Sequence, residues 1–215
     1  MQVIVCCNER QKEELLSVGP QQESGVFYIA DINDIARSTG GGVILDLLFV
    51  HDEKRISLLK QSGHTVIINS VVHTVEEIDP CFVRINAWPT FLSSALTEAA
   101  CLHNEIKERA TLALQRLNRQ TEWLPDEPGF ITPRVTCMII NEAYFALSEG
   151  VSTKEEMDLA TKLGTAYPYG PFAWAEKIGL DKIVDLLSRL GRTESRYIPS
   201  ELLLQEAQNR KMTIR

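Results

Sequence analysis

The feature that most constrains this sequence is a series of turn signals between residues 128 and 181, which divides an otherwise helical stretch into short pieces. Pro128-Gly129 is a turn signal that precedes the first helical pattern. Gly150, Gly164 and Gly179 follow at helix-length intervals, and glycine commonly ends a helix because it tolerates the left-handed backbone conformation. The C-terminal part of the chain is therefore predicted to be a unit of several short helices.

The starts of these helices are also marked. Ser152 with Glu155 three residues later matches a capping box, and Pro171 suits the first position of a helix. Pro199-Ser200 predicts one more helix that runs to about residue 208. Apolar residues recur at helical spacing in the first helix and predict one buried face: Val135, Met138, Ile139, Ala143 and Ala146.

These turn and capping residues, in this order and at these spacings, resemble those of the C-terminal helical domain of the 3-hydroxyacyl-CoA dehydrogenase family. The matching residues are Pro128-Gly129-Phe130-Ile131, Arg134, Asn141-Glu142-Ala143, Glu149-Gly150-Val151, Met157-Asp158, Lys162-Leu163-Gly164, Tyr167-Pro168, Gly170-Pro171-Phe172 and Gly179-Leu180-Asp181. The resemblance implies an NAD-dependent oxidoreductase of fatty acid metabolism that acts on 3-hydroxyacyl-CoA. It also implies a Rossmann-type nucleotide-binding domain before the helices.

The N-terminal part of the sequence agrees with that expectation, because apolar runs alternate with short helical patterns. Strands are predicted at residues 2–7, 26–30, 42–50, 65–69 and 82–86, and a long helix at 92–117 is followed by a last strand at 122–124. Such alternation indicates a parallel α/β sheet. We therefore expect a shortened Rossmann-like domain at residues 1–127 and a helical domain at residues 128–215, with a ligand groove between them.

Composition restricts the partners. The net charge of −7 argues against nucleic acid, whose phosphates need a basic surface. No apolar run approaches 18 residues and no signal-peptide pattern is present, so we expect a soluble protein that is not exported. The five cysteines form no metal-ligand pattern with histidines and predict reduced thiols in the cytoplasm.

The cofactor turn departs from the family pattern. A Rossmann domain binds the dinucleotide pyrophosphate on a glycine-rich turn after its first strand, but here residues 6–11 contain no glycine. Glu9 would repel the phosphates, at roughly 3 kcal/mol for a like-charge pair about 5 Å apart in an effective dielectric of about 20. Arg10 offsets part of this cost. Asp31, at the end of the second strand, is either a ribose-binding acid or an ordinary strand-end residue.

The acid–base pair departs from the pattern too. Oxidation of a 3-hydroxyacyl thioester needs a base for the hydroxyl proton, and the family uses a His that is oriented by a Glu. On a gapless register through residues 84–98, the resemblance places Glu98 at the Glu position and Asn86 at the His position. An amide donates hydrogen bonds but does not titrate near neutral pH, and loss of a base costs about 10² to 10⁴ in rate.

Other positions keep part of the family pattern. The substrate-contacting Ser-Asn-Thr-Ser loop of the family corresponds to residues 68–71, of which Asn69 and Ser70 are candidate substrate-binding residues. Pro133 stands where the family has an Asn and supplies no amide. Asp46 lies in an apolar strand, so its carboxylate is either satisfied structurally or functional.

Two histidines provide an alternative base. His51 follows the third strand and His73 the fourth, and the ends of such strands line the ligand crevice of a parallel sheet. Each is either a relocated base or an ordinary surface residue. Cys6 and Cys7 at the end of the first strand are either reactive thiols near a helix N-terminus or packing residues.

Two functions follow. The favoured hypothesis is a divergent family member that has lost hydride-transfer chemistry and retains a groove for an acyl-CoA-like ligand. The alternative is a working NAD-dependent dehydrogenase with an unusual cofactor turn. In both cases the resemblance implies a homodimer through the helical domain, whose aromatic residues either supply that interface or fill the helical core: Tyr144, Phe145, Tyr167, Tyr169, Phe172 and Trp174.

Overall fold

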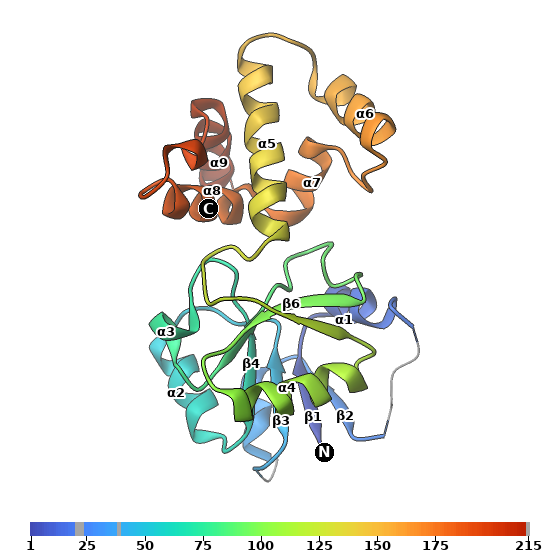
Figure 1. Cartoon of the computed structure of the whole chain (residues 1–215), viewed down its shortest axis with the longest axis vertical. Coiled ribbons are helices and arrows are strands. Elements are labelled where there is room, and N and C mark those ends of the chain that lie inside the picture. The colour runs from blue at the N-terminus through green and yellow to red at the C-terminus, as the bar shows by residue number, and fades with distance from the viewer. Residues whose placement is uncertain (20–23, 38–39, 214–215) are drawn as a thin grey trace. The chain divides into compact units, whose positions relative to one another are not determined.

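The computed structural model describes residues 1–19, 24–37 and 40–213 and divides them into two compact units, Met1–Phe130 and Ile131–Arg215 (Figure 1). The predicted boundary after residue 127 lies three residues before this division.

The first unit is built on a seven-stranded sheet with the order β2-β1-β3-β4-β5-β6-β7. Neighbouring strands run parallel except β5 and β6, which are antiparallel. The predicted fold class, a Rossmann-like sheet domain followed by a helical domain, is confirmed. The strands are β1 (Val3–Cys6), β2 (Val26–Ile29), β3 (Val43–Asp46), β4 (Thr65–Asn69), β5 (Val83–Ile85), β6 (Leu96–Ala100) and β7 (Gln120–Trp123).

Helices cover both faces of this sheet because successive residues of its central strands are apolar on both sides. Val3 and Val5 of β1 join a core that includes Leu15 of α1 (Glu9–Leu16) and Leu114 of α4 (Asn104–Arg116). Ile4 and Cys6 point to the opposite core. That second core is covered by η1 (Ile32–Arg37), α2 (Glu53–Gln61) and α3 (Val75–Ile78).

One prediction for this unit is wrong. Residues 92–117 do not form a single helix: Leu96–Ala100 form β6, and α4 begins at Asn104. Leu, Glu and Ala favour helices in isolation, but β6 pairs with β5 on one side and β7 on the other. The side chains of residues 97–100 are buried there, and such tertiary packing overrides a weak local propensity.

The second unit is helical. It consists of α5 (Thr132–Ser148), α6 (Lys154–Thr165), α7 (Pro171–Ile178), α8 (Leu180–Leu190), η2 (Ser195–Tyr197) and α9 (Glu201–Thr213). Helix α5 contacts α7, α8 and α9 and is the centre of the unit, as Figure 1 shows. Asn141 of α5 is buried and donates to Ile198 O and accepts from Ser200 N, which fixes the entry of the chain into α9.

Most of the predicted turn residues lie at helix ends, but α6 continues through Gly164 to Thr165. Pro171 opens α7, and Gly179, with φ of 101°, separates α7 from α8. The capping box of α6 is displaced by one residue, because Thr153 rather than Ser152 accepts from the backbone of Glu156. Val135, predicted to be buried, is 52% exposed.

Candidate functional site at the carboxyl edge of the sheet

The strand order changes direction between β1 and β3, because the chain places β2 on one side of β1 and β3 on the other. In open α/β sheets, ligands bind outside the carboxyl ends of the strands at this switch point. The candidate site is therefore built from the residues that follow β1, β3, β4 and β5.

The turn after β1 satisfies its own polar groups. Asn8 caps α1 by accepting from Gln11 N at 2.9 Å, and the Gln11 side chain accepts from Asn8 N at 3.1 Å. Gln11 Nε2 also donates to Leu47 O, just after β3, at 2.9 Å. A single side chain thus bridges the switch point from α1 to the end of β3, a contact that local sequence patterns do not reveal.

The two cysteines beside this turn are buried. Burial raises the pKa of the Cys6 thiol to about 12 and that of the Cys7 thiol to about 11. Since the thiolate is the reactive form, neither residue is poised as a nucleophile near neutral pH. This result favours the packing role over the reactive one.

Asp46, the last residue of β3, is fully buried and paired with Arg55 of α2. Arg55 Nη2 lies 2.6 Å from Asp46 Oδ1, and Arg55 Nε lies 2.7 Å from Asp46 Oδ2. The same carboxylate accepts from Leu48 N at 3.1 Å. These partners account for the buried charge and favour the structural interpretation of Asp46.

Asp31 follows β2 and is exposed. Its Oδ1 atom accepts from both the backbone and the side-chain amide of Asn33, at 2.9 and 2.8 Å. These bonds are typical of an Asx turn at the start of a loop, here at the start of η1.

Asn86 and Glu98 lie together, as the gapless register requires. Asn86 follows β5, Glu98 belongs to the antiparallel strand β6, and Asn86 Nδ2 donates to Glu98 Oε2 at 2.9 Å. Both side chains are buried, and Trp88 N donates to Asn86 Oδ1 at 3.4 Å. The amide thus lies beside the carboxylate, and the assignment of these two residues to the family's His and Glu positions stays a prediction.

Asn69 and Ser70, at the end of β4, bond to the protein itself. Asn69 Oδ1 accepts from Ala87 N at 3.1 Å, and Asn69 Nδ2 lies 3.4 Å from Leu47 O. Ser70 Oγ donates to His73 O at 2.8 Å. Together with Gln11, Asn69 forms a chain of hydrogen bonds along the carboxyl edge from α1 to the end of β5.

The two candidate histidines at this edge are in contact. The rings of His51 and His73 pack edge to face with their centroids 4.6 Å apart. His73 Nδ1 lies 3.7 Å from Glu77 Oε2, and the same oxygen accepts from Thr74 N at the start of α3. The sequence placed both histidines at strand ends, but their contact depends on the pairing of β3 with β4.

Two buried arginines hold the loops of this edge, and sequence reasoning missed both. Arg119 donates to Ser94 O at 2.7 Å and to Leu92 O, and its burial lowers its pKa to about 10. Arg84 of β5 is fully buried and pairs with Asp126, whose carboxylate also accepts from Val75 N. Both roles depend on residues distant in sequence, so local patterns carry no signal for them.

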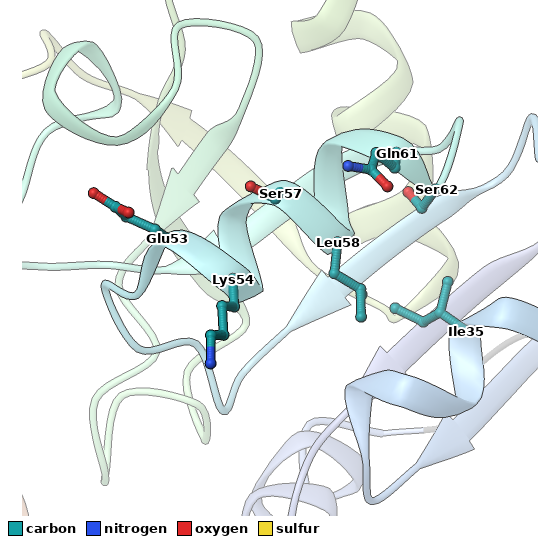
Figure 2. A pocket seen from close by; sticks show the side chains of 7 residues that line it. All are labelled: Ile35, Glu53, Lys54, Ser57, Leu58, Gln61 and Ser62. Atoms are coloured by element: carbon teal, nitrogen blue, oxygen red, sulfur yellow. The ribbon is translucent and has the colours of Figure 1, made fainter.

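A surface groove of about 700 Å³ lies elsewhere in the first unit, along α2 and beside η1. Figure 2 shows that Leu58 and Ile35 point toward one another across it, while Glu53 and Lys54 project from the first turn of α2. None of the predicted site residues lines this groove. It therefore adds nothing to the candidate site.

Two further findings concern metal binding and membrane insertion. Among residues 1–19, 24–37 and 40–213, no group of three His, Cys, Asp or Glu side chains is arranged to bind a metal ion. Within the same part of the chain, no helix has both the length and the apolar character needed to cross a bilayer.

Comparisons with known proteins agree with the fold. Residues 129–213 match the family model "3-hydroxyacyl-CoA dehydrogenase, C-terminal domain". The chain is 38% identical over 114 residues to 3-hydroxyadipyl-CoA dehydrogenase of Escherichia coli K12, a match that covers 52% of this chain and 24% of that protein. The matched part thus spans about a quarter of that relative's length.

Two solved structures share the fold over most of the chain. FadB2 of M. tuberculosis superposes with a TM-score of 0.74 at 14% identity, covering 97% of this chain and 93% of that chain. The (S)-3-hydroxybutyryl-CoA dehydrogenase PaaH1 of Ralstonia eutropha superposes with a TM-score of 0.71 at 18% identity, covering 94% and 91%. At these identities the likeness establishes the fold alone.

Proposed function

Because this chain belongs to the 3-hydroxyacyl-CoA dehydrogenase family through residues 129–213, we propose that it binds an acyl-CoA-like ligand but does not catalyse hydride transfer. The observation that carries the proposal is the pairing of Asn86 with Glu98. The carboxylate that would orient a base holds an amide instead.

The chemical consequence follows from the reaction. Hydride can leave a 3-hydroxyacyl thioester only as its hydroxyl proton is removed, and this requires a group that accepts a proton near neutral pH. Asn86 donates its amide hydrogen to Glu98 and cannot take up that proton. Loss of the base alone lowers the rate by about 10² to 10⁴.

The cofactor turn adds an independent obstacle. NAD would need backbone N–H groups at the start of α1, but those of Asn8 and Gln11 already donate within a capping box. Glu9 in the first turn of α1 adds a negative charge where phosphates would lie. The residues present do not fit the dinucleotide, and NAD is needed only if the alternative, an active dehydrogenase, is correct.

Ligand binding is proposed at the carboxyl edge of the sheet, where Asn69 and Ser70 provide polar groups and Asn86 and Glu98 lie alongside. A thermal-shift screen with CoA and acyl-CoAs tests this part of the proposal. We expect acyl-CoA to raise the melting temperature, since a ligand that binds the folded state stabilises it. No shift at millimolar ligand would rule out this binding function.

The catalytic part is tested by NADH formation from 3-hydroxybutyryl-CoA and NAD at 340 nm. We expect no turnover from the wild-type protein, nor from Asn86→His, because the cofactor turn fails independently of the base. Asn104→His, an exposed position at the start of α4, is the matched control. Turnover by the wild type would overturn the proposal, and turnover by Asn86→His alone would show that the turn accepts NAD.

We further propose that the protein is cytoplasmic and forms a homodimer through its second unit. All five cysteines are free thiols, in keeping with a reducing compartment. Tyr144, Phe172 and Trp174 are buried in the helical core, whereas Phe145 and Tyr167 are 38% and 37% exposed and are available to an interface.

A further inference from the structure

We infer that the dinucleotide crevice of this protein is closed by one of its own side chains, Gln11, which acts as a strut across the switch point. This inference rests on the proposed function and identifies the residue that excludes the cofactor. It depends on the geometry of the crevice rather than on the missing base.

The strut is held at both ends. Gln11 Oε1 accepts from Asn8 N at 3.1 Å, and Gln11 Nε2 donates to Leu47 O at 2.9 Å. Because the acceptor and donor of the amide are both engaged, the side chain is fixed in a single orientation. It runs from the first turn of α1, which follows β1, to the residue after β3. The ends of β1 and β3 flank the place where the strand order reverses.

The far end of the strut belongs to a larger network. Leu47 O is also approached by Asn69 Nδ2 at 3.4 Å, and Asn69 Oδ1 accepts from Ala87 N at 3.1 Å. The bonds therefore tie the ends of β3, β4 and β5 to α1. A dinucleotide that bound between the ends of β1 and β3 would have to displace the Gln11 side chain from Leu47 O.

The N-terminus of α1 offers few backbone donors to a phosphate in exchange for the broken Gln11–Leu47 hydrogen bond. The N-terminal donors of an α-helix attract phosphate because they lack partners inside the helix. In α1, Asn8 Oδ1 accepts from Gln11 N at 2.9 Å, so one of these donors is already satisfied. Glu9 at the first helical position is acidic and repels an anionic ligand. The Gln11 bridge, the engaged donor and Glu9 thus all act against cofactor binding.

The test is a titration with NADH that measures binding by nucleotide fluorescence and does not depend on turnover. The proteins compared are the wild type, Gln11→Ala, Gln11→Ser and the control Gln115→Ala, which makes the same change at an exposed position of α4. A net hydrogen bond corresponds to about a tenfold change in affinity. We therefore expect both Gln11 variants to bind NADH about tenfold more tightly than the wild type, and Gln115→Ala to bind like the wild type.

Circular dichroism establishes that each variant is folded, and the two Gln11 variants provide independent tests. The inference is overturned if folded Gln11→Ala and Gln11→Ser bind NADH no more tightly than the wild type. The proposed function is judged separately, by turnover of the wild type, so the two failures are distinguishable.

Discussion

At the scale of single residues, Asp46 shows how a buried charge is accommodated. Its carboxylate has no exposed surface and is matched by the guanidinium of Arg55 and the backbone N–H of Leu48. Removal of one partner of such a pair leaves the other charge without compensation, which costs about 3 to 5 kcal/mol.

We therefore expect Asp46→Ala to lower the free energy of unfolding by about 3 kcal/mol, because Arg55 would remain largely buried without its partner. Urea unfolding of wild type and variant measures this difference. Asp34→Ala, at an exposed aspartate of the same unit, is the control and should change stability by less than about 0.5 kcal/mol. Equal effects of the two substitutions would contradict the structural role of Asp46.

A second residue-scale prediction concerns His64, whose neutral ring accepts from Gly42 N at 3.1 Å. Burial lowers the pKa of His64, and the positive charge of Arg109 acts in the same direction. The unfolded chain therefore binds this proton at a higher pH than the folded chain does. Stability from this group is present above its unfolded pKa of about 6.5 and is lost as pH falls through the lower folded value.

Replacement of His64 by Gln should therefore reduce the loss of stability between pH 7 and pH 5. The measurement is the urea midpoint of wild type and His64→Gln at both pH values. An identical pH dependence in the two proteins would show that His64 does not contribute to acid destabilisation.

Residue roles differed in how well the sequence could predict them. The adjacency of Asn86 and Glu98 follows from a register that a family resemblance supplies. In the structure, Asn86 Nδ2 lies 2.9 Å from Glu98 Oε2. The Gln11–Leu47 bridge has no such signal, because 36 residues separate its ends and the contact exists only after β1 and β3 have paired. The roles of Arg84 and Arg119 are long-range for the same reason.

At the scale of elements, the junction between α6 and α7 is fixed by one carboxylate. Asp158 of α6 accepts from Phe172 N at 2.8 Å and from Ala173 N at 2.9 Å, and so caps the N-terminus of α7. Gly170 lies directly against this residue, since a Cβ at position 170 would come within 2.4 Å of Asp158 Cα. The glycine at this position is therefore required by close packing.

Gly170→Ala should lower the free energy of unfolding by about 1 to 3 kcal/mol, as overpacking of a tight contact does. Gly164→Ala is the matched control, because a Cβ there meets nothing within 4 Å and alanine suits a helix better by about 1 kcal/mol. Thermal unfolding of both variants should give shifts of opposite sign. A neutral Gly170→Ala would contradict the close packing of Gly170 against Asp158.

Elements were predicted best where local signals and tertiary structure agree. The glycines and prolines of residues 128–181 act locally, and the helices α5, α7 and α8 begin or end beside them. Strand β6 was missed because Leu, Glu and Ala favour a helix, and its strand conformation depends on pairing with β5 and β7. The capping box of α6 was displaced by one residue because Ser152 and Thr153 are chemically alike.

At the scale of the whole molecule, the proposed homodimer is argued from α6. Helix α6 has no buried residue. Polar contacts join it to its neighbours: Asp158 accepts from Phe172 N of α7, and Lys154 Nζ lies 2.5 Å from Glu206 Oε1 of α9. Leu159 and Leu163 are 59% and 76% exposed, and Val151 just before the helix is 68% exposed. Exposed apolar surface of this kind is typical of an interface between subunits.

We expect light scattering at tens of micromolar to give the mass of a dimer. Leu163→Glu should shift the mass toward the monomer, because a charge would be buried in the interface. Lys162→Glu introduces the same residue at the neighbouring exposed position and should leave the dimer intact. A monomeric wild-type protein would rule out the homodimer.

We propose that this molecule has the fold of a dehydrogenase but does not bind NAD. The most direct test is calorimetric titration of the wild-type protein with NAD and with NADH. The closed switch point, the glycine-free turn and Glu9 together predict no binding with a dissociation constant below about 100 µM, a free energy of roughly −5.5 kcal/mol. A dissociation constant below that value for either nucleotide would contradict the claim.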